Sequence, residues 1–299
     1  MKSVVINSRC GIGDAVAYSF PLCRLLKEKE NKTVEFWQIN KENLMSLARC
    51  LPYIDNIEFF YFDYEIDYSD PVKMVKEFIF LNKKTIERAK KTLEDADEVY
   101  LLSSASKELQ IAMTDMWGVT DRVIDHQFPL FLPDANTGYA PMYNFALVGK
   151  EYDQRYMDFD LEWFKEYHHD FQCKKNSILL NCDAAESWKR GYAQEDELRA
   201  ILTDRGFDVR RFDYTIPLPT NLFLVAQVSY ILTVTTSTVY LAKALNRNEE
   251  TYVITPTDAY RDYKRFLRIN EICNGIRIDP EKLADLFCEE IKWCQYGFL

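Results

Sequence analysis

Apolar and polar positions alternate regularly along the chain. Short runs rich in β-branched and aromatic residues are separated by longer segments in which apolar residues recur every three or four positions. The short runs predict strands, and the longer segments predict helices. Because strands that alternate with helices are typical of a parallel sheet, we expect an α/β fold.

The first half of the chain holds one such series. Its predicted strands are Ser3–Ser8, Thr33–Ile39, Asn56–Phe62 and Glu98–Ser103. Its predicted helices run from the end of the first strand to Lys29, and then over Pro71–Leu93 and Ala112–Trp117. The stretch Asp125–Tyr143 contains several prolines and predicts irregular structure.

The second half repeats the pattern. Its predicted strands are Ser177–Cys182, Asp208–Phe212, Tyr230–Val234 and Thr251–Thr255. Its predicted helices are Glu195–Asp204, Asn221–Ser229, Thr238–Asn246 and Pro280–Trp293. The rhythm breaks over Lys150–Gln172, which predicts a linker. We therefore expect two Rossmann-like domains, residues 1–155 and 156–299.

The composition narrows the class of protein. The 299 residues are 47% hydrophobic, which is enough for two cores. No apolar run approaches the roughly 20 residues of a membrane span, and Met1–Ile6 lacks the apolar core of a signal peptide, so we expect a cytoplasmic protein. The net charge of -10 argues against a broad surface for nucleic acid.

Cysteine and histidine usage argues against a disulfide framework and against a metal site. None of the eight cysteines forms a C-x-x-C pair, and most lie in apolar runs, so we expect reduced, buried thiols. Only three histidines are present, two of them adjacent, and we expect no metal and no cofactor.

The first loop after a strand carries two glycines and one carboxylate. Gly11 and Gly13 allow a backbone with positive φ and a close approach of a ligand, and the free N–H groups of the following helix, expected from Ala15, suit an anion. Asp14 lies at the N-cap or in the first turn. It is either a plain helix cap or a general base that deprotonates an acceptor hydroxyl.

A dinucleotide-binding motif at this loop is excluded on two counts. Val16 stands where G-x-G-x-x-G needs its third glycine. The second predicted strand ends at Gln38-Ile39-Asn40, without an acidic residue to hold a ribose.

Two further loops carry cationic or hydroxyl side chains. Trp188, Lys189 and Arg190 follow a predicted strand, where the two cations either neutralise a diphosphate or form a solvated turn. Thr236 and Ser237, next to Thr235, lie where another strand runs into a helix. These hydroxyls either cap the helix or help to cradle a phosphate at its N-terminus.

A final loop, Thr255-Pro256-Thr257-Asp258, contains turn-forming residues, and its simplest role is structural. The basic residues that follow it have near-helical spacing: Arg261, Lys264, Arg265 and Arg268. They form either a solvated helix face or a local patch for an acidic partner.

Taken in order, these loops resemble glycosyltransferase family 9, the bacterial heptosyltransferase-like enzymes. Gly13-Asp14 followed by Pro21-Leu22 and Leu26-Lys27 is similar to the opening signature of that family. Trp188-Lys189 resembles its second-domain loop, and Thr235-Thr236-Ser237 resembles its D-T-G segment. Thr255–Asp258 resembles its G-P-T-D loop.

The resemblance implies a fold of the GT-B type, in which two Rossmann-like domains face each other and the last helix packs back toward the first domain. It implies an acceptor-side first domain and a second domain that binds a nucleotide-sugar. It also implies inverting, metal-independent sugar transfer, with Asp14 as the base. Gly11, Gly13, Lys189, Arg190 and Thr235–Ser237 would hold the phosphates of the donor, and Trp188, Tyr240 and Asp258 are candidate substrate contacts.

The chain departs from the family pattern at three positions of the D-T-G segment. Thr235 replaces the acidic residue that helps to hold the donor sugar, Ser237 replaces the glycine, and Tyr240 replaces a histidine. A heptose donor is therefore not carried over. The departures keep open a non-catalytic nucleotide-sugar or glycan-binding module, and the acceptor stays open between a glycan or lipid-linked sugar, a protein and a hydroxylated base in phage-type DNA.

Overall fold

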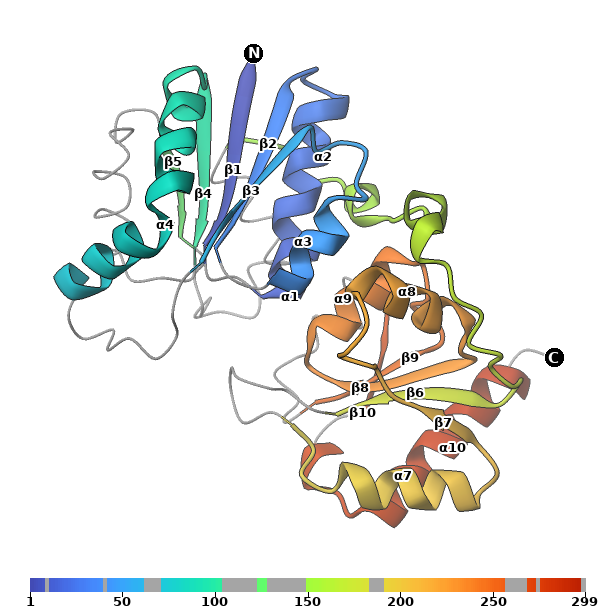
Figure 1. Ribbon diagram of the computed structural model, residues 1–299. Coiled ribbons are helices and arrows are strands. Elements are labelled where there is room, and N and C mark those ends of the chain that lie inside the picture. Colours follow the sequence, from blue (N-terminus) through green and yellow to red (C-terminus); the bar gives the residue numbers. More distant parts are fainter. Residues whose placement is uncertain are drawn as a thin grey trace. The chain divides into compact units, whose positions relative to one another are not determined.

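A computed structural model describes residues 1–8, 11–39, 42–61, 71–103, 123–127, 149–182, 191–255, 268–272 and 275–296. The chain divides into two compact units, Met1–Met157 and Asp158–Leu299. The division lies two residues beyond the predicted boundary. Within the described residues, each unit contains one five-stranded sheet (Figure 1).

The sheet of the N-terminal unit is parallel throughout, with the order β3-β2-β1-β4-β5. Its strands are β1 (Lys2–Ser8), β2 (Thr33–Ile39), β3 (Asn56–Phe60), β4 (Glu98–Ser103) and β5 (Val123–Gln127). Helices cover both faces, so the central strand is apolar without alternation, and Val4, Val5 and Ile6 are fully buried.

Helices connect the successive parallel strands from β1 to β4, because a crossover between parallel strands needs an intervening segment. They are α1 (Ile12–Asp14), the π-helix η1 (Ala15–Ser19), α2 (Phe20–Glu28), α3 (Glu42–Ala48) and α4 (Pro71–Glu94). Figure 1 shows α2 and α3 on one face of the sheet and α4 on the other. The chain crosses back over the sheet between β3 and β4, which explains the change of face.

The sheet of the C-terminal unit is also parallel, with the order β10-β9-β8-β6-β7. Its strands are β6 (Ser177–Asn181), β7 (Asp208–Arg210), β8 (Tyr230–Val234), β9 (Thr251–Ile254) and β10 (Asn270–Ile272). The strands β6, β8 and β9 are almost entirely buried, as expected for a sheet that is covered on both faces.

Two pairs of helices enclose this sheet. They are α7 (Glu195–Asp204) with α10 (Pro280–Tyr296) on one face, and α8 (Leu218–Gln227) with α9 (Ser237–Ala244) on the other (Figure 1). Three 3-10 helices complete the described elements: η2 (Gln154–Met157), η3 (Leu161–Tyr167) and η6 (Gly275–Arg277). In the core beneath α7 and α10, the rings of Tyr252 and Phe287 lie 5.1 Å apart.

The last helix packs against α7 within its own unit, where Leu283 and Phe287 are fully buried. The expected packing of this helix toward the first domain stays a prediction. The predicted linker, 150–172, contains η2 in the first unit and η3 in the second.

Several predictions of secondary structure differ from the structure. The first helix begins at Ile12 rather than Ala15, and the short elements α3 and β10 were missed. The strand β5 overlaps the stretch that its prolines predicted to be irregular. The predicted helix Ala112–Trp117 lies outside the described residues. Elements of three to seven residues give too few periods of the apolar pattern to be recognised.

A cluster of charges lies at the amino ends of the N-terminal strands. The ammonium group of Lys32, whose side chain is 3% exposed, contacts the carboxylates of Glu30 at 2.6 Å and of Glu98. Lys150 reaches the other oxygen of Glu30 at 2.5 Å. These contacts tie the segment at residue 150 to the N-terminal unit.

Five cysteines of the described part of the chain are thiols and not disulfides: Cys23, Cys50, Cys173, Cys182 and Cys288. Only Cys23 and Cys182 are buried, so the expectation of buried thiols is wrong for the other three. Over the same ranges, no group of three or more His, Cys, Asp or Glu side chains is arranged to hold a metal ion. A membrane-spanning helix is likewise absent from the described residues.

Candidate functional site

Each sheet has one point at which the strand order reverses. In the N-terminal unit the chain leaves β1 toward β2 on one side and later returns to β4 on the other. In the C-terminal unit the same reversal lies between β6 and β8. In open parallel sheets, ligands bind outside the carboxyl ends of the strands at such switch points. The predicted site residues that lie within the described ranges follow strands that flank these two points.

Asp14 lies in the first turn of α1, directly after β1. Its Oδ2 atom accepts a hydrogen bond of 2.9 Å from the backbone N–H of Gly11, the N-cap residue. Burial raises the pKa of the Asp14 carboxyl above its usual value, and the hydrogen bond from Gly11 acts against this without cancelling it. The side chain therefore satisfies a helix-terminal donor and is also a better proton acceptor than an exposed aspartate.

The two glycines of this loop do not use a left-handed backbone. Gly11 has a φ of -74°, and Gly13 lies inside α1. A Cβ atom on Gly11 would meet Asp14 Oδ2 at 3.6 Å, an ordinary contact. The positive φ that these glycines would allow is therefore not used, and the Gly11 N–H already donates to Asp14. A phosphate at this loop would have to share or displace that hydrogen bond.

A buried polar network, which was not predicted from the sequence, connects η1 with the ends of β1 and β2. Ser19, the last residue of η1, donates to Asn7 Oδ1 at 3.0 Å, and Asn7 Nδ2 donates to Gln38 Oε1 at 2.7 Å. All three residues are fully buried. Because Asn7 and Gln38 are paired neighbours near the ends of β1 and β2, the network fixes the π-helix to the carboxyl edge of the sheet.

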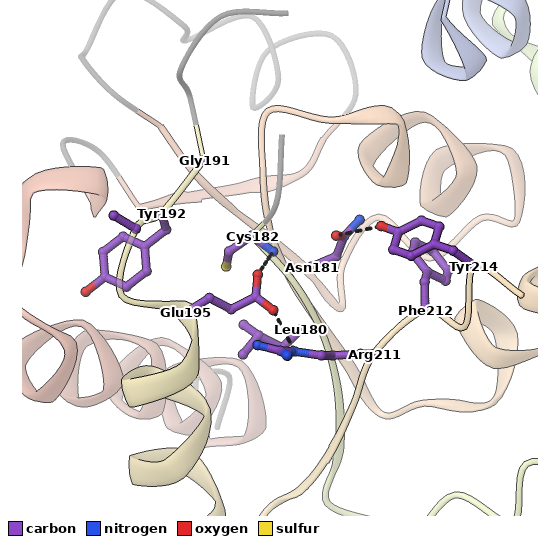
Figure 2. Close-up of a pocket in the computed structure, with 10 residues that line it drawn as sticks. Leu180, Asn181, Cys182, Gly191, Tyr192, Glu195, Arg211, Phe212 and Tyr214 are labelled. Carbon is purple, nitrogen blue, oxygen red and sulfur yellow. Dashed lines mark hydrogen bonds and ion pairs between the residues drawn. The ribbon is translucent and has the colours of Figure 1, made fainter. Parts of the chain in front are cut away.

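A cavity of about 580 Å³ lies at the carboxyl end of β6 in the C-terminal unit (Figure 2). Its volume is in the usual range for a small-molecule site. The described residues that line it come from the end of β6, from the approach to α7 and from the segment after β7: Leu180, Asn181, Cys182, Gly191, Tyr192, Ala193, Glu195, Arg211, Phe212 and Tyr214.

Cys182 joins the two ends of the loop that leads from β6 to α7. Its N–H donates to Glu195 Oε2 at 2.8 Å, and its C=O accepts from the N–H of Tyr192 at 2.9 Å. Glu195 also forms an ion pair of 2.7 Å with Arg211. The candidates Trp188, Lys189 and Arg190 belong to this loop but lie outside the described residues.

Hydroxyl side chains gather where β8 runs into α9. Thr236 is the N-cap of α9, and its Oγ1 accepts from the N–H of Thr238 at 3.3 Å. Thr233 Oγ1 lies 3.2 Å from Thr236 Oγ1 and donates to the C=O of Asn181 at 2.7 Å. Thr236 therefore caps the helix, which is one of the two roles predicted for it. Ser237 begins the helix, and Tyr240 is half-buried in it.

Two hydroxyl oxygens at this edge, those of Thr235 and Thr255, are buried and have no hydrogen-bond partner among the described residues. They directly follow Val234 and Ile254, which are paired across β8 and β9, so both threonines lie just beyond the carboxyl ends of neighbouring strands. Leaving a buried polar group unpaired costs about 1–3 kcal/mol, so two such groups at one edge of the sheet indicate a place where a polar ligand or water is received.

Asn181 connects the cavity with the N-terminus of α9. It lines the cavity, accepts from the hydroxyl of Tyr214 at 3.3 Å and donates from Nδ2 to Thr238 Oγ1 at 2.5 Å. Asn181 and Thr255 were not predicted as site residues. Each is a polar residue at the end of an apolar strand, and Thr255 also begins the loop that resembles G-P-T-D; no further signal in the sequence points to either residue. Asp258 lies outside the described residues, as do Arg261, Lys264 and Arg265.

Comparison with known proteins gives structural likeness only. No family model and no curated protein matches the chain. The structure is similar to the ADP-heptose LPS heptosyltransferase II of E. coli, with a TM-score of 0.62, 14% identity and coverage of 98% of this chain and 99% of the other. A glycosyl transferase of family 9 from Veillonella parvula gives a TM-score of 0.56 at 12% identity, with 97% of each chain covered.

The likeness extends beyond glycosyltransferases. The UDP-GlcNAc 2-epimerase from Neisseria meningitidis, bound to UDP-GlcNAc, gives a TM-score of 0.53 at 11% identity and covers 99% of this chain and 93% of the other. At such identities the likeness establishes the fold and not the activity. The chain thus has the two-domain α/β fold of GT-B glycosyltransferases, in agreement with the resemblance drawn from its motifs.

Proposed function

We propose that the protein is a glycosyltransferase that moves a sugar from a nucleoside-diphosphate donor to an acceptor hydroxyl. The donor binds at the carboxyl edge of the C-terminal sheet, and the acceptor is activated by Asp14 of the N-terminal unit. The mechanism is inverting and needs no metal ion or cofactor. Two proteins of similar fold support this class of ligand: the heptosyltransferase is named for ADP-heptose, and the epimerase is bound to UDP-GlcNAc.

One observation carries the proposal: the unpaired hydroxyls of Thr235 and Thr255 lie at the same edge of the sheet as the N-terminus of α9. The free N–H groups of a helix N-terminus favour an anion, and hydroxyls donate to phosphate oxygens. A diphosphate at this place would satisfy both hydroxyls. Asn181 links the place to a cavity large enough for the rest of a nucleotide.

The reaction follows as a single displacement. Asp14 accepts the proton of the acceptor hydroxyl, the acceptor oxygen forms a bond to the anomeric carbon, and the bond from that carbon to the diphosphate oxygen breaks. The electron pair leaves with the nucleoside diphosphate, and the configuration at the carbon inverts. The raised pKa of Asp14 supports its role, because a base with a pKa nearer to neutrality takes the proton more readily.

The leaving diphosphate needs positive charge as the bond breaks. We assign this to Lys189 and Arg190, with Thr236 and Ser237 at the N-terminus of α9. Gly11 and Gly13 provide room at the Asp14 loop. Trp188, Tyr240 and Asp258 are proposed to contact the sugar or the acceptor.

The proposal is tested by turnover. Purified protein is incubated with a panel of nucleotide-sugars and candidate acceptors, and the release of nucleoside diphosphate is followed for wild type, Asp14→Asn and the control Asp95→Asn. Asp95 is exposed and lies before β4, away from the carboxyl edge. We expect release from one donor that falls at least a hundredfold in Asp14→Asn, while donor binding persists and the control is unchanged.

The alternatives give different results in the same assay. A donor sugar that is isomerised without acceptor would contradict transfer and indicate an epimerase. Donor binding without turnover, with every class of acceptor supplied, would indicate a binding module. For a DNA acceptor, binding would weaken steeply as salt rises, whereas a glycan or protein acceptor predicts a shallow salt dependence.

A further inference from the structure

The cavity beside β6 is lined by side chains whose charges cancel. Glu195 and Arg211 are the only charged residues among its described lining, and they are paired to each other at 2.7 Å. Arg211 also pairs with Asp196 at 2.6 Å, and Glu195 accepts the N–H of Cys182. Neither side chain is left with an unbalanced charge, so the described part of the lining suits a neutral group better than a phosphate.

One side of the cavity is aromatic. The rings of Phe212 and Tyr214 lie 6.2 Å apart and, in Figure 2, stand together across from Tyr192. Tyr214 is 73% exposed, which is unusual for a large aromatic side chain at a concave site. Its hydroxyl is nevertheless held by Asn181 Oδ1 at 3.3 Å, so the ring is oriented before any ligand arrives.

We propose that Tyr214 stacks on the base of the nucleoside diphosphate and, with Phe212, makes the cavity the nucleoside half of the donor site. This inference rests on the proposed function and assigns a residue within it. A nucleobase is neutral and planar and presents a π-face, which an exposed, pre-oriented tyrosine ring can cover.

The hydrogen bonds of Asn181 give the direction of the bound nucleotide. Its Oδ1 atom holds Tyr214, and its Nδ2 atom donates to Thr238 in the first turn of α9. The base therefore lies on the Tyr214 side of Asn181, and the phosphates lie on the α9 side, where the unpaired hydroxyls are. The neutral group and the anionic group are thus each placed against the lining that suits it.

The test compares ligands with and without a base. Binding of ADP, GDP, UDP and CDP, and of inorganic pyrophosphate as the base-free probe, is measured by titration calorimetry for wild type and three variants. Tyr214→Ala removes the ring, and Tyr214→Phe keeps the ring without its hydrogen bond to Asn181. Tyr61→Ala removes another exposed tyrosine, which is 54% exposed in the N-terminal unit.

We expect at least one nucleoside diphosphate to bind more tightly than pyrophosphate. Tyr214→Ala should weaken that nucleotide about tenfold or more, the size of one lost base–aromatic stack, and leave pyrophosphate unchanged. Tyr214→Phe should keep most of the affinity, and Tyr61→Ala all of it.

Two results overturn the inference in distinguishable ways. If a nucleoside diphosphate binds and Tyr214→Ala binds it as tightly as wild type does, or loses pyrophosphate to the same extent, the stacking role is wrong while the proposed function stands. If wild type binds none of the four nucleotides and no nucleotide-sugar, the proposed function falls together with the inference.

Discussion

The side-chain amide of Asn181 donates to Thr238 Oγ1 at 2.5 Å and so joins the end of β6 to the first turn of α9. Both groups are buried. Since β6 and β8 flank the switch point of the C-terminal sheet, this hydrogen bond fixes the relation between the strand that lines the cavity and the helix end that suits an anion. Together with the hydrogen bond from Thr233 to the C=O of Asn181, it joins the cavity to the N-terminus of α9.

Asn181→Leu should lower the free energy of unfolding of the C-terminal unit by about 1–3 kcal/mol, because the change leaves the buried hydroxyl of Thr238 without its donor. Thr238→Val removes the other partner. The double variant should cost less than the sum of the single changes, which denaturant unfolding of the four proteins measures. Additive losses would show that the two side chains are not coupled.

Removing the unpaired hydroxyl of Thr255 should have opposite effects on stability and on nucleotide binding. Thr255→Val removes a polar atom that has no partner, so it should leave the ligand-free protein as stable or raise its free energy of unfolding by about 1–2 kcal/mol. The same change should weaken nucleoside-diphosphate binding. Titration calorimetry and thermal melting measure the two effects.

Thr251→Val is the matched control, because Thr251 is equally buried in β9 but its hydroxyl donates to the C=O of Arg247 at 2.6 Å. This variant should lose stability and keep its affinity for the nucleotide. A loss of stability in Thr255→Val as large as that in Thr251→Val would contradict a ligand-directed role for the Thr255 hydroxyl.

Eight of the ten described strands and most helices could be predicted, because a buried parallel strand is a continuous apolar run, whereas β5 and β10 were not recognised. The position of Asp14 at the carboxyl edge could be predicted because a glycine-bearing turn follows the first strand, and its catalytic role stays a proposal. The neighbourhood of Thr235 and Thr255 could not be predicted, since it depends on the pairing of β8 with β9. Tyr214 gave no signal either: it is one of two aromatic residues in a short segment before Pro217, and only the structure places it at a cavity beside Asn181.

The raised pKa of Asp14 predicts a conflict between stability and activity. A carboxyl whose pKa is higher in the folded than in the unfolded state destabilises the fold once it is ionised, so its contribution falls as pH rises through the folded pKa. Asp14→Asn should therefore melt at a higher temperature than wild type at pH 7, and the difference should shrink as the pH is lowered. The control Asp95→Asn, at an exposed position, should melt like wild type at pH 7, and a lower melting temperature for Asp14→Asn at that pH would contradict the assigned direction.

The charge cluster at the amino edge predicts sensitivity to acid. Burial tends to raise the pKa of Glu98, but hydrogen bonds from Lys32 and Tyr100 outweigh it, so the pKa lies below its usual value. A carboxyl whose pKa is lowered in the folded state stabilises the protein above its unfolded pKa, which is about 4.3 for glutamate. This stabilisation is lost as the pH falls through the folded pKa.

Glu98→Gln should lower the free energy of unfolding by about 1 kcal/mol at pH 7. Below about pH 4, the free energy of unfolding of this variant should fall less with decreasing pH than that of wild type. Urea unfolding across this pH range measures both. Glu94→Gln, at an exposed position in the last turn of α4, serves as the control. Equal acid sensitivity of wild type and Glu98→Gln would show that the cluster does not contribute.

The proposed function requires first of all that the intact protein binds a nucleotide-sugar. Titration calorimetry with a panel of purine and pyrimidine nucleoside-diphosphate sugars should give saturable 1:1 binding for at least one of them, weakened in a Thr235→Val variant and absent for the free sugar. Binding of that kind would support a donor site at the carboxyl edge of the C-terminal sheet. If the folded, monodisperse protein binds none of these donors, the proposed glycosyltransferase function is contradicted.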